Sequence, residues 1–153
     1  MKKFLSFIFI AVVFSTTLLG VETVRTGIQG IPVRFQGRYS IFNTHDMVSG
    51  QMNNIGGRTG DRLQLTSDTA YIAGMTLKLN GTGSQLSNPW LLKNNVIYRQ
   101  YYSENMEGIM FGATNSSGTQ FILFMLWTPV NNAYMISCIN LSTGVEFVYS
   151  AHK

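Results

Sequence analysis

The chain has 153 residues, which is enough for one domain, and only 12% of them are charged. Its formal net charge is +4, but the Lys and Arg residues are spread thinly, which excludes a basic nucleic-acid-binding patch. Cys138 is the single cysteine, so an internal disulfide is excluded and packing must hold the fold together.

A secretory signal peptide is predicted over residues 1–20. Lys2-Lys3 forms a short positive region, and Phe4 to Phe14 is apolar except for one serine. This run is shorter than the about 20 residues that a membrane-spanning helix needs. We therefore expect cleavage, a secreted or periplasmic protein without a stable transmembrane anchor, and a mature domain of residues 21–153.

The first half of this domain shows strands separated by glycine-rich connections. Residues 21–32 lack a clear period and predict an extended arm, whereas residues 33–42 predict a strand with Gly37 in its middle. Residues 43–60 predict a long loop, a kind of segment that is often functional or mobile. Strands are predicted again at 62–66 and at 70–79.

The second half begins with a turn. Asn80-Gly81 is a strong two-residue hairpin signal, followed by a weak return strand over 82–86. Ser87 or Asn88 can cap a helix of one or two turns that carries Trp90. Further strands are predicted at 96–102, 108–114, 119–129, 133–141 and 145–150.

The strand at 119–129 is the most apolar of the chain. Alternation places Phe121, Leu123, Met125 and Trp127 on one face, and Ile122, Phe124 and Leu126 on the other. Neither face is polar, so we expect both to be covered by protein, a ligand or a partner.

The number and spacing of the strands predict the fold class. Short strands with tight turns and almost no helix indicate an all-β, single-domain antiparallel up-and-down β-barrel of about eight strands. A β-sandwich is the alternative.

Motifs for catalysis or metal binding are not found. His45 and His152 are the two histidines, and with one cysteine they give no zinc spacing. Glu104 and Glu107 indicate a solvated turn, and Gly56 to Gly60 lacks the Lys-Ser/Thr ending of a phosphate loop. We predict a protein that is not an enzyme and has no cofactor or metal.

Large apolar residues are abundant: the chain has 10 Phe, 7 Tyr and 8 Met. In a small barrel they either fill the interior or line a pocket for one hydrophobic ligand, and both interpretations stay open. For the second interpretation we place Trp90 near the mouth. The candidate ligand-binding residues are Tyr39, Tyr71, Met75, Trp90, Tyr98, Tyr102, Phe121, Leu123, Met125 and Trp127.

Two segments resemble a known family. Phe35-Gln36-Gly37-Arg38-Tyr39 is similar to the Gly-x-Trp opening of lipocalins and related calycins, with Tyr39 in place of Trp. Gly60 to Thr66 resembles the second strand of small exported bacterial lipocalin-like domains. The final strand, 145–150, lacks the basic residue that would pack on the Trp position. The resemblance implies an eight-stranded barrel, open at one end, that binds a small apolar molecule.

Two functional hypotheses follow. The first is a non-enzymatic binding protein that holds a small hydrophobic or lipid ligand inside the barrel. The second is a protein-interaction module, either a periplasmic inhibitor or an assembly subunit. It would contact a protein partner or a second copy through an apolar strand face or through residues 43–60.

Overall fold

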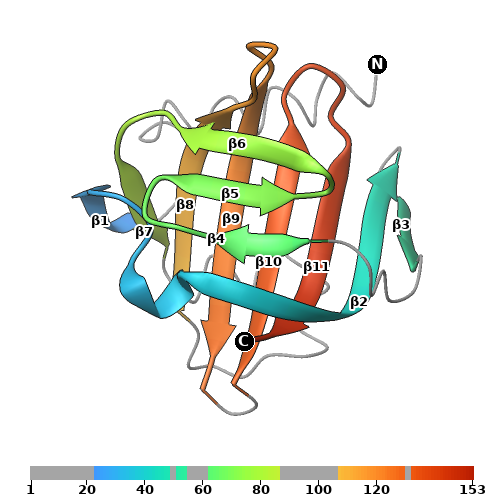
Figure 1. The fold of residues 1–153 in the computed structure, drawn as a ribbon, viewed down its shortest axis with the longest axis horizontal. Coiled ribbons are helices and arrows are strands. Elements are labelled where there is room, and N and C mark those ends of the chain that lie inside the picture. Colours follow the sequence, from blue (N-terminus) through green and yellow to red (C-terminus); the bar gives the residue numbers. More distant parts are fainter. Residues whose placement is uncertain (1–22, 49–50, 55–61, 87–106, 130–131) are drawn as a thin grey trace.

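The computed structural model describes residues 23–48, 51–54, 62–86, 107–129 and 132–153, which form eleven strands and one short 3₁₀ helix (Figure 1). No helix within these residues is long and apolar enough to span a bilayer. The predicted signal peptide, the helix with Trp90 and the strand at 96–102 lie outside the described residues. The elements are β1 (Thr23–Ile28), η1 (Val33–Phe35), β2 (Gly37–Val48), β3 (Gln51–Asn54), β4 (Leu63–Leu65), β5 (Thr69–Ile72), β6 (Met75–Leu79), β7 (Gly83–Leu86), β8 (Glu107–Thr114), β9 (Gln120–Thr128), β10 (Ala133–Asn140) and β11 (Glu146–His152).

Eight of the strands close into an antiparallel barrel. They follow one another around it in chain order, as β2-β4-β5-β6-β8-β9-β10-β11, and β11 pairs back with β2. In Figure 1, β4, β5 and β6 lie in front of β8 to β11 and cross them. The predicted up-and-down barrel is confirmed, and the chain does not form the alternative β-sandwich.

β9 has the two faces that its alternation predicts. Phe121, Leu123 and Met125 belong to the cluster that fills the barrel, whereas Ile122 and Leu126 belong to a second cluster on the outer face. The long pairings with β8 and β10 hold this register. Both faces of β9 are therefore covered, as the absence of a polar face requires.

The outer cluster extends over β8, β10 and β11. Its apolar side chains are buried like those of the interior, so this part of the barrel wall is apolar on both sides. The members are Leu86, Met110, Ile122, Leu126, Ala133, Met135, Ile139 and Val148.

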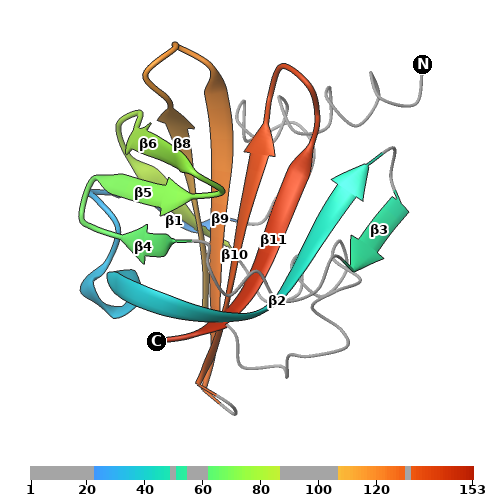
Figure 2. The ribbon, with the colours of Figure 1, turned by 45° about the vertical axis from the view of Figure 1, so that its right-hand side comes forward.

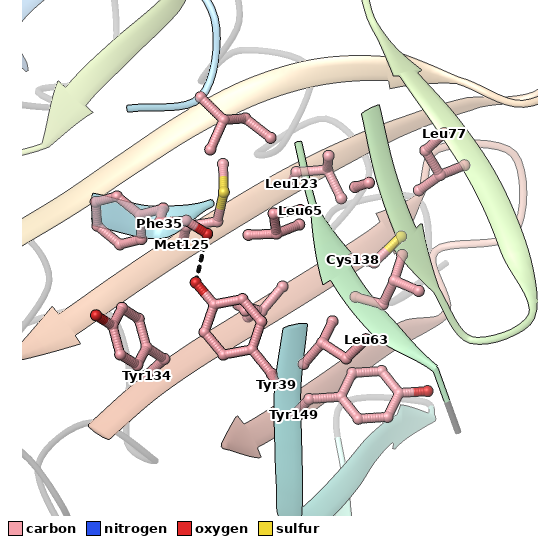
Figure 3. Packing of buried hydrophobic residues seen from close by; sticks show 14 of the residues in the cluster. Phe35, Tyr39, Leu63, Leu65, Leu77, Leu123, Met125, Tyr134, Cys138 and Tyr149 are labelled. Carbon is pink, nitrogen blue, oxygen red and sulfur yellow. Dashed lines mark hydrogen bonds between the residues drawn. The ribbon is translucent and has the colours of Figure 1, made fainter. Parts of the chain in front are cut away.

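Helix η1 closes one end of the barrel. Phe35 is completely buried there, and its ring meets that of Tyr134 edge to face with centroids 6.1 Å apart. The Tyr39 hydroxyl donates a hydrogen bond to the Phe35 carbonyl (Figure 3). Lys153 Nζ and the Tyr134 hydroxyl donate to the Arg34 carbonyl over 2.9 and 3.3 Å. Burial raises the pKa of Tyr39 well above its usual value, so this hydroxyl stays protonated.

The prediction of one strand over residues 70–79 is wrong, because a tight turn divides it into β5 and β6. Ala73 and Gly74 both have positive φ, at 52° and 74°, which gives the mirror-image turn that suits a two-residue hairpin. The division changes the face of Tyr71. Its neighbours Ala70 and Ile72 point inward, and its ring lies under the Arg62 guanidinium, 4.1 Å from ring centroid to Cζ.

The hairpin predicted at Asn80-Gly81 is also wrong. β6 and β7 do not pair with each other; both pair with β8, so the chain only bends between them. The Asn80 amide N–H donates to the Gly112 carbonyl over 2.8 Å, and the Thr114 hydroxyl donates to Asn80 Oδ1 over 2.8 Å. These contacts to β8 fix the bend, so that β7 pairs with β8 as β6 does.

The long loop predicted at 43–60 is in part a hairpin. β2 runs on to Val48 because β11 pairs with it as far as Met47, and β3 then folds back along its end. β3 lies on the side of β2 that faces away from β11, beyond the barrel wall (Figure 2). The arm predicted at 21–32 likewise contains β1, which pairs with β7.

Candidate ligand-binding pocket

An apolar cavity of about 230 Å³ lies at the end of the barrel opposite η1 and is partly open to the outside. It is formed by the start of β6, the start of β9 and the hairpin between β10 and β11. The residues that line it are Met75, Phe121, Cys138, Asn140, Thr143, Val145 and Phe147.

Strand register brings the lining residues together. Phe121 of β9 lies opposite Asn140 of β10, and Cys138 of β10 lies opposite Phe147 of β11. Side chains two residues apart on a strand share a face, so Cys138 and Asn140 both point to the interior side. The cavity therefore lies between the last layer of the barrel core and the β10–β11 turn.

The β10–β11 turn is held by two side chains. Asn140 Oδ1 accepts hydrogen bonds from the amide N–H groups of Ser142 and Thr143, over 2.8 and 3.2 Å. The Thr143 hydroxyl oxygen accepts from the Val145 amide over 3.3 Å, and the Gly144 amide donates to the Asn140 carbonyl over 2.8 Å. This is the local bonding by which Asn and Thr fix turns, and it gives the cavity a defined rim.

The cavity is uncharged. None of the described residues that line it is acidic or basic. Burial raises the pKa of the Cys138 thiol to about 12, with a smaller contribution from the charge of Glu146. The thiol thus remains protonated at neutral pH and is a poor nucleophile.

Below the cavity the described core residues are closely packed. Leu123, Ile136 and Tyr149 have exposures of 0%, and close packing of this kind leaves no room for a chain to pass deeper. Figure 3 shows Tyr149, Leu123 and Leu63 in this middle layer. The apolar residues therefore fill this part of the described interior and leave a cavity at one end of the barrel.

The predicted ligand-binding residues are distributed along the whole barrel. Met75 and Phe121 line the cavity, whereas Leu123, Met125 and Tyr39 are buried in the packed interior. Trp127 is at the closed end, and Tyr71 is on the outside. Trp90, Tyr98 and Tyr102 lie outside the described residues.

Trp127 is occupied by structural contacts at the closed end. The Arg34 guanidinium lies over its ring, 4.5 Å from the centroid, and its indole N–H donates to Asn132 Oδ1 over 3.0 Å. Arg34 also forms an ion pair with Glu107. These contacts help to close the end of the barrel that is remote from the cavity.

Five lining residues were not among the sequence-based candidates. Phe147 follows from the alternation of β11, because Val148 next to it belongs to the outer cluster. Cys138 is a buried free thiol on β10. Asn140, Thr143 and Val145 belong to a turn, and no periodicity in the sequence marks a turn as part of a pocket.

His45 lies on β2 opposite Val148, away from the cavity. It is 4% exposed, its Nδ1 has no partner among the described residues, and burial lowers its pKa. Thus no described carboxylate orients it as a general base would require. Among all the residues that the structure describes, no three His, Cys, Asp or Glu side chains come together at a metal-binding distance. The absence of enzymatic activity stays a prediction.

Glu146 gives a testable pH dependence. Its Oε1 accepts a hydrogen bond from the Ser137 hydroxyl over 2.8 Å, yet burial raises its pKa above the usual 4.5. The charged form therefore destabilises the fold at neutral pH, and this effect disappears as the pH falls through the raised pKa towards 4.5. We expect Glu146→Gln to raise the free energy of unfolding at pH 7 by about 1 kcal/mol.

Urea unfolding between pH 4 and pH 8 checks this expectation. The difference between Glu146→Gln and the wild type should shrink towards the acid end of the range. The matched control is Glu107→Gln, which removes a carboxylate that is paired with Arg34 and should give no gain in stability. Equal gains for both variants, or a gain independent of pH, would contradict the assignment.

Comparisons of the chain with protein-family profiles, with curated proteins and with solved structures find no match. The geometry of the barrel and its cavity is therefore the basis on which a function is argued.

Proposed function

We propose that this protein is an exported, non-enzymatic binding protein that holds a small hydrophobic molecule at the open end of its β-barrel. The observation that carries the proposal is the apolar cavity of about 230 Å³ at one end of a barrel whose described core residues are closely packed. Ligand sites are typically concave, mostly apolar and supplied with a few polar groups. Here Asn140 and Thr143 are the polar groups.

Contacts at the closed end support a lipocalin-like assignment. Gly37-Arg38-Tyr39 opens the first barrel strand, and the Tyr39 hydroxyl is bonded to η1. Lys153, one residue beyond β11, supplies a basic group that the final strand itself lacks, and its ammonium donates to the Arg34 carbonyl. One end is closed by a helix and the other carries the cavity, as expected for a small carrier of this type.

Export is part of the proposal and rests on the N-terminal pattern of Lys2-Lys3 followed by the apolar run from Phe4 to Phe14. Expression of the full chain in a host with a secretory pathway tests it. We expect the processed protein outside the cytoplasm, with its new N-terminus near residue 21. An unprocessed chain that remains in the cytoplasm would contradict export and leave the binding proposal to its own test.

Binding is tested with a variant that fills the cavity. Val145→Phe places a ring in the space that a ligand would occupy, so the chemical-shift changes that benzene causes in the amide NMR spectrum of the wild type should be lost. Val24→Phe is the matched control, because Val24 is 66% exposed on β1 and should leave binding unchanged. Benzene binding by Val145→Phe, or none by the wild type, would contradict the proposal.

The alternative function, a protein-interaction module, is favoured by a different feature. β3 pairs with β2 alone among the described strands and lies beyond the barrel wall (Figure 2). An unpaired strand edge can accept a strand from another protein. Light scattering during size-exclusion chromatography separates the cases, because a stable monomer with benzene in its cavity supports the carrier and an obligate oligomer supports the module.

A further inference from the structure

We infer that the ligand is a small uncharged molecule with a single-ring body and one hydrogen-bond acceptor, and that the side-chain amide of Asn140 binds this acceptor. The inference rests on the proposed binding function and specifies the ligand. It excludes fatty acids and long lipid chains.

The size limit comes from the cavity volume. A cavity of about 150 Å³ with apolar walls binds benzene, so the about 230 Å³ found here admits a ring with a short substituent. Pockets for drug-sized ligands begin at about 300 Å³. The layer below, with Leu123 and Ile136 at 0% exposure, offers no further space into which an acyl chain could extend.

The walls favour an aromatic body. Phe121 and Phe147 supply two rings, which attract another ring in stacked or edge-to-face geometry. Met75 and Cys138 supply two sulfur atoms, which are polarisable and make favourable contacts with aromatic rings. A ring therefore gains more from this lining than an alkyl group of the same volume.

The charges around the cavity exclude an anion. No basic side chain is among the described lining residues, and Lys153 and Arg34 lie at the opposite end of the barrel. Among the described residues, the charge of Glu146 acts on Cys138 from the neighbouring strand. A carboxylate in the cavity would lose its hydration, gain no ion pair and be repelled by Glu146.

The polar groups of the rim define the complementary group on the ligand. Asn140 Oδ1 already accepts two backbone N–H groups, which fixes the orientation of the amide and leaves Nδ2 without an acceptor among the described residues. The Thr143 oxygen accepts from the Val145 amide and keeps its proton free to donate. The Thr143 oxygen has one further lone pair, but both side chains have a proton free to donate, so an acceptor on the ligand, such as a carbonyl or ether oxygen, can bind to both.

Four probes separate these features: ethylbenzene, acetophenone, benzoate and dodecanoate. Acetophenone has nearly the shape of ethylbenzene with an added acceptor, so in NMR titrations of the full folded domain it should bind about 2- to 10-fold more tightly, as one neutral hydrogen bond allows. Benzoate has the same ring with a negative charge and should bind at least about tenfold more weakly than acetophenone. Dodecanoate should not displace either ring.

Asn140→Asp tests the role of the amide. An aspartate oxygen can still accept from the Ser142 and Thr143 amides, but the amide donor is gone and only the Thr143 hydroxyl can still donate. The advantage of acetophenone over ethylbenzene should therefore shrink while ethylbenzene binding persists. Asn115→Asp is the matched control: Asn115 Oδ1 also accepts two turn amides, from Ser117 and Thr119, but Asn115 does not line the cavity. This control should keep the acetophenone preference.

The outcomes distinguish the inference from the proposed function. Equal binding of acetophenone and ethylbenzene by the wild type would overturn the assignment of Asn140. Benzoate or dodecanoate binding as tightly as acetophenone would overturn the exclusion of anions and chains, while the binding function would stand. If no probe binds and benzene leaves the spectrum unchanged, the proposed function fails together with the inference.

Discussion

Replacing Phe35 with alanine should lower the free energy of unfolding by about 3–5 kcal/mol, the range for removing a fully buried aromatic ring. Its ring is 0% exposed and fills the end of the barrel beside Tyr134. The lost stability has two contributions: the free energy that the ring gains by leaving water, and the cost of the cavity that remains in the core. The cavity will not collapse easily, because hydrogen bonds to the Arg34 and Phe35 carbonyls hold η1 in place.

Urea unfolding followed by tryptophan fluorescence measures this change. The matched control is Val33→Ala in the same helix, since Val33 is 80% exposed and its truncation should change the stability by no more than about 0.5 kcal/mol. A similar loss for both variants would mean that η1 does not close the barrel as described. A fall in the denaturant slope rather than in the midpoint would instead report a change in compactness.

The parts of the fold that the sequence predicts are those in which one strand's own pattern is sufficient. Phe121 to Trp127 alternate between two apolar clusters as expected, because successive side chains on a strand point to opposite faces. The number of barrel strands and their order in a meander also follow from strand spacing and tight turns.

Turn chemistry is where prediction from sequence failed, in two opposite ways. Ala73-Gly74 forms a tight hairpin although alanine rarely adopts positive φ, whereas Asn80-Gly81 has the strongest hairpin signal and does not form one. At the second site β8 accepts both flanking strands, so its pairing decides the path of the chain. A partner strand contributes more hydrogen bonds than one turn, and local propensity is overridden.

The candidate site was predictable only in part, for the same reason. Met75 and Phe121 were identified as large inward residues, and both line the cavity. The polar rim was missed because Asn140 and Thr143 function through hydrogen bonds made after the β10–β11 turn has formed. Their position beside Phe121 is fixed by the pairing of β9 with β10, which a single sequence does not reveal.

A second large effect on stability is expected for Gly83→Ala. A methyl group at this position would lie 2.4 Å from Cε1 and 2.5 Å from Cζ of the Phe111 ring. Phe111 is 1% exposed and belongs to the barrel core, so its ring has little free space into which to move. Overpacking of this kind costs about 1–3 kcal/mol, and we expect a loss of this size in urea unfolding at pH 7.

A double-mutant cycle separates overpacking from a backbone effect. Phe111→Leu alone should destabilise the barrel, but combined with Gly83→Ala it should cost less than the sum of the two single changes, because the smaller side chain leaves room for the methyl group. Additive losses would show that the glycine is needed for its backbone rather than for the ring above it. Gly83 is the first residue of β7, which pairs with β8 just after the bend that follows β6. A favourable coupling energy would therefore locate a tight contact, between Gly83 and Phe111, beside this bend.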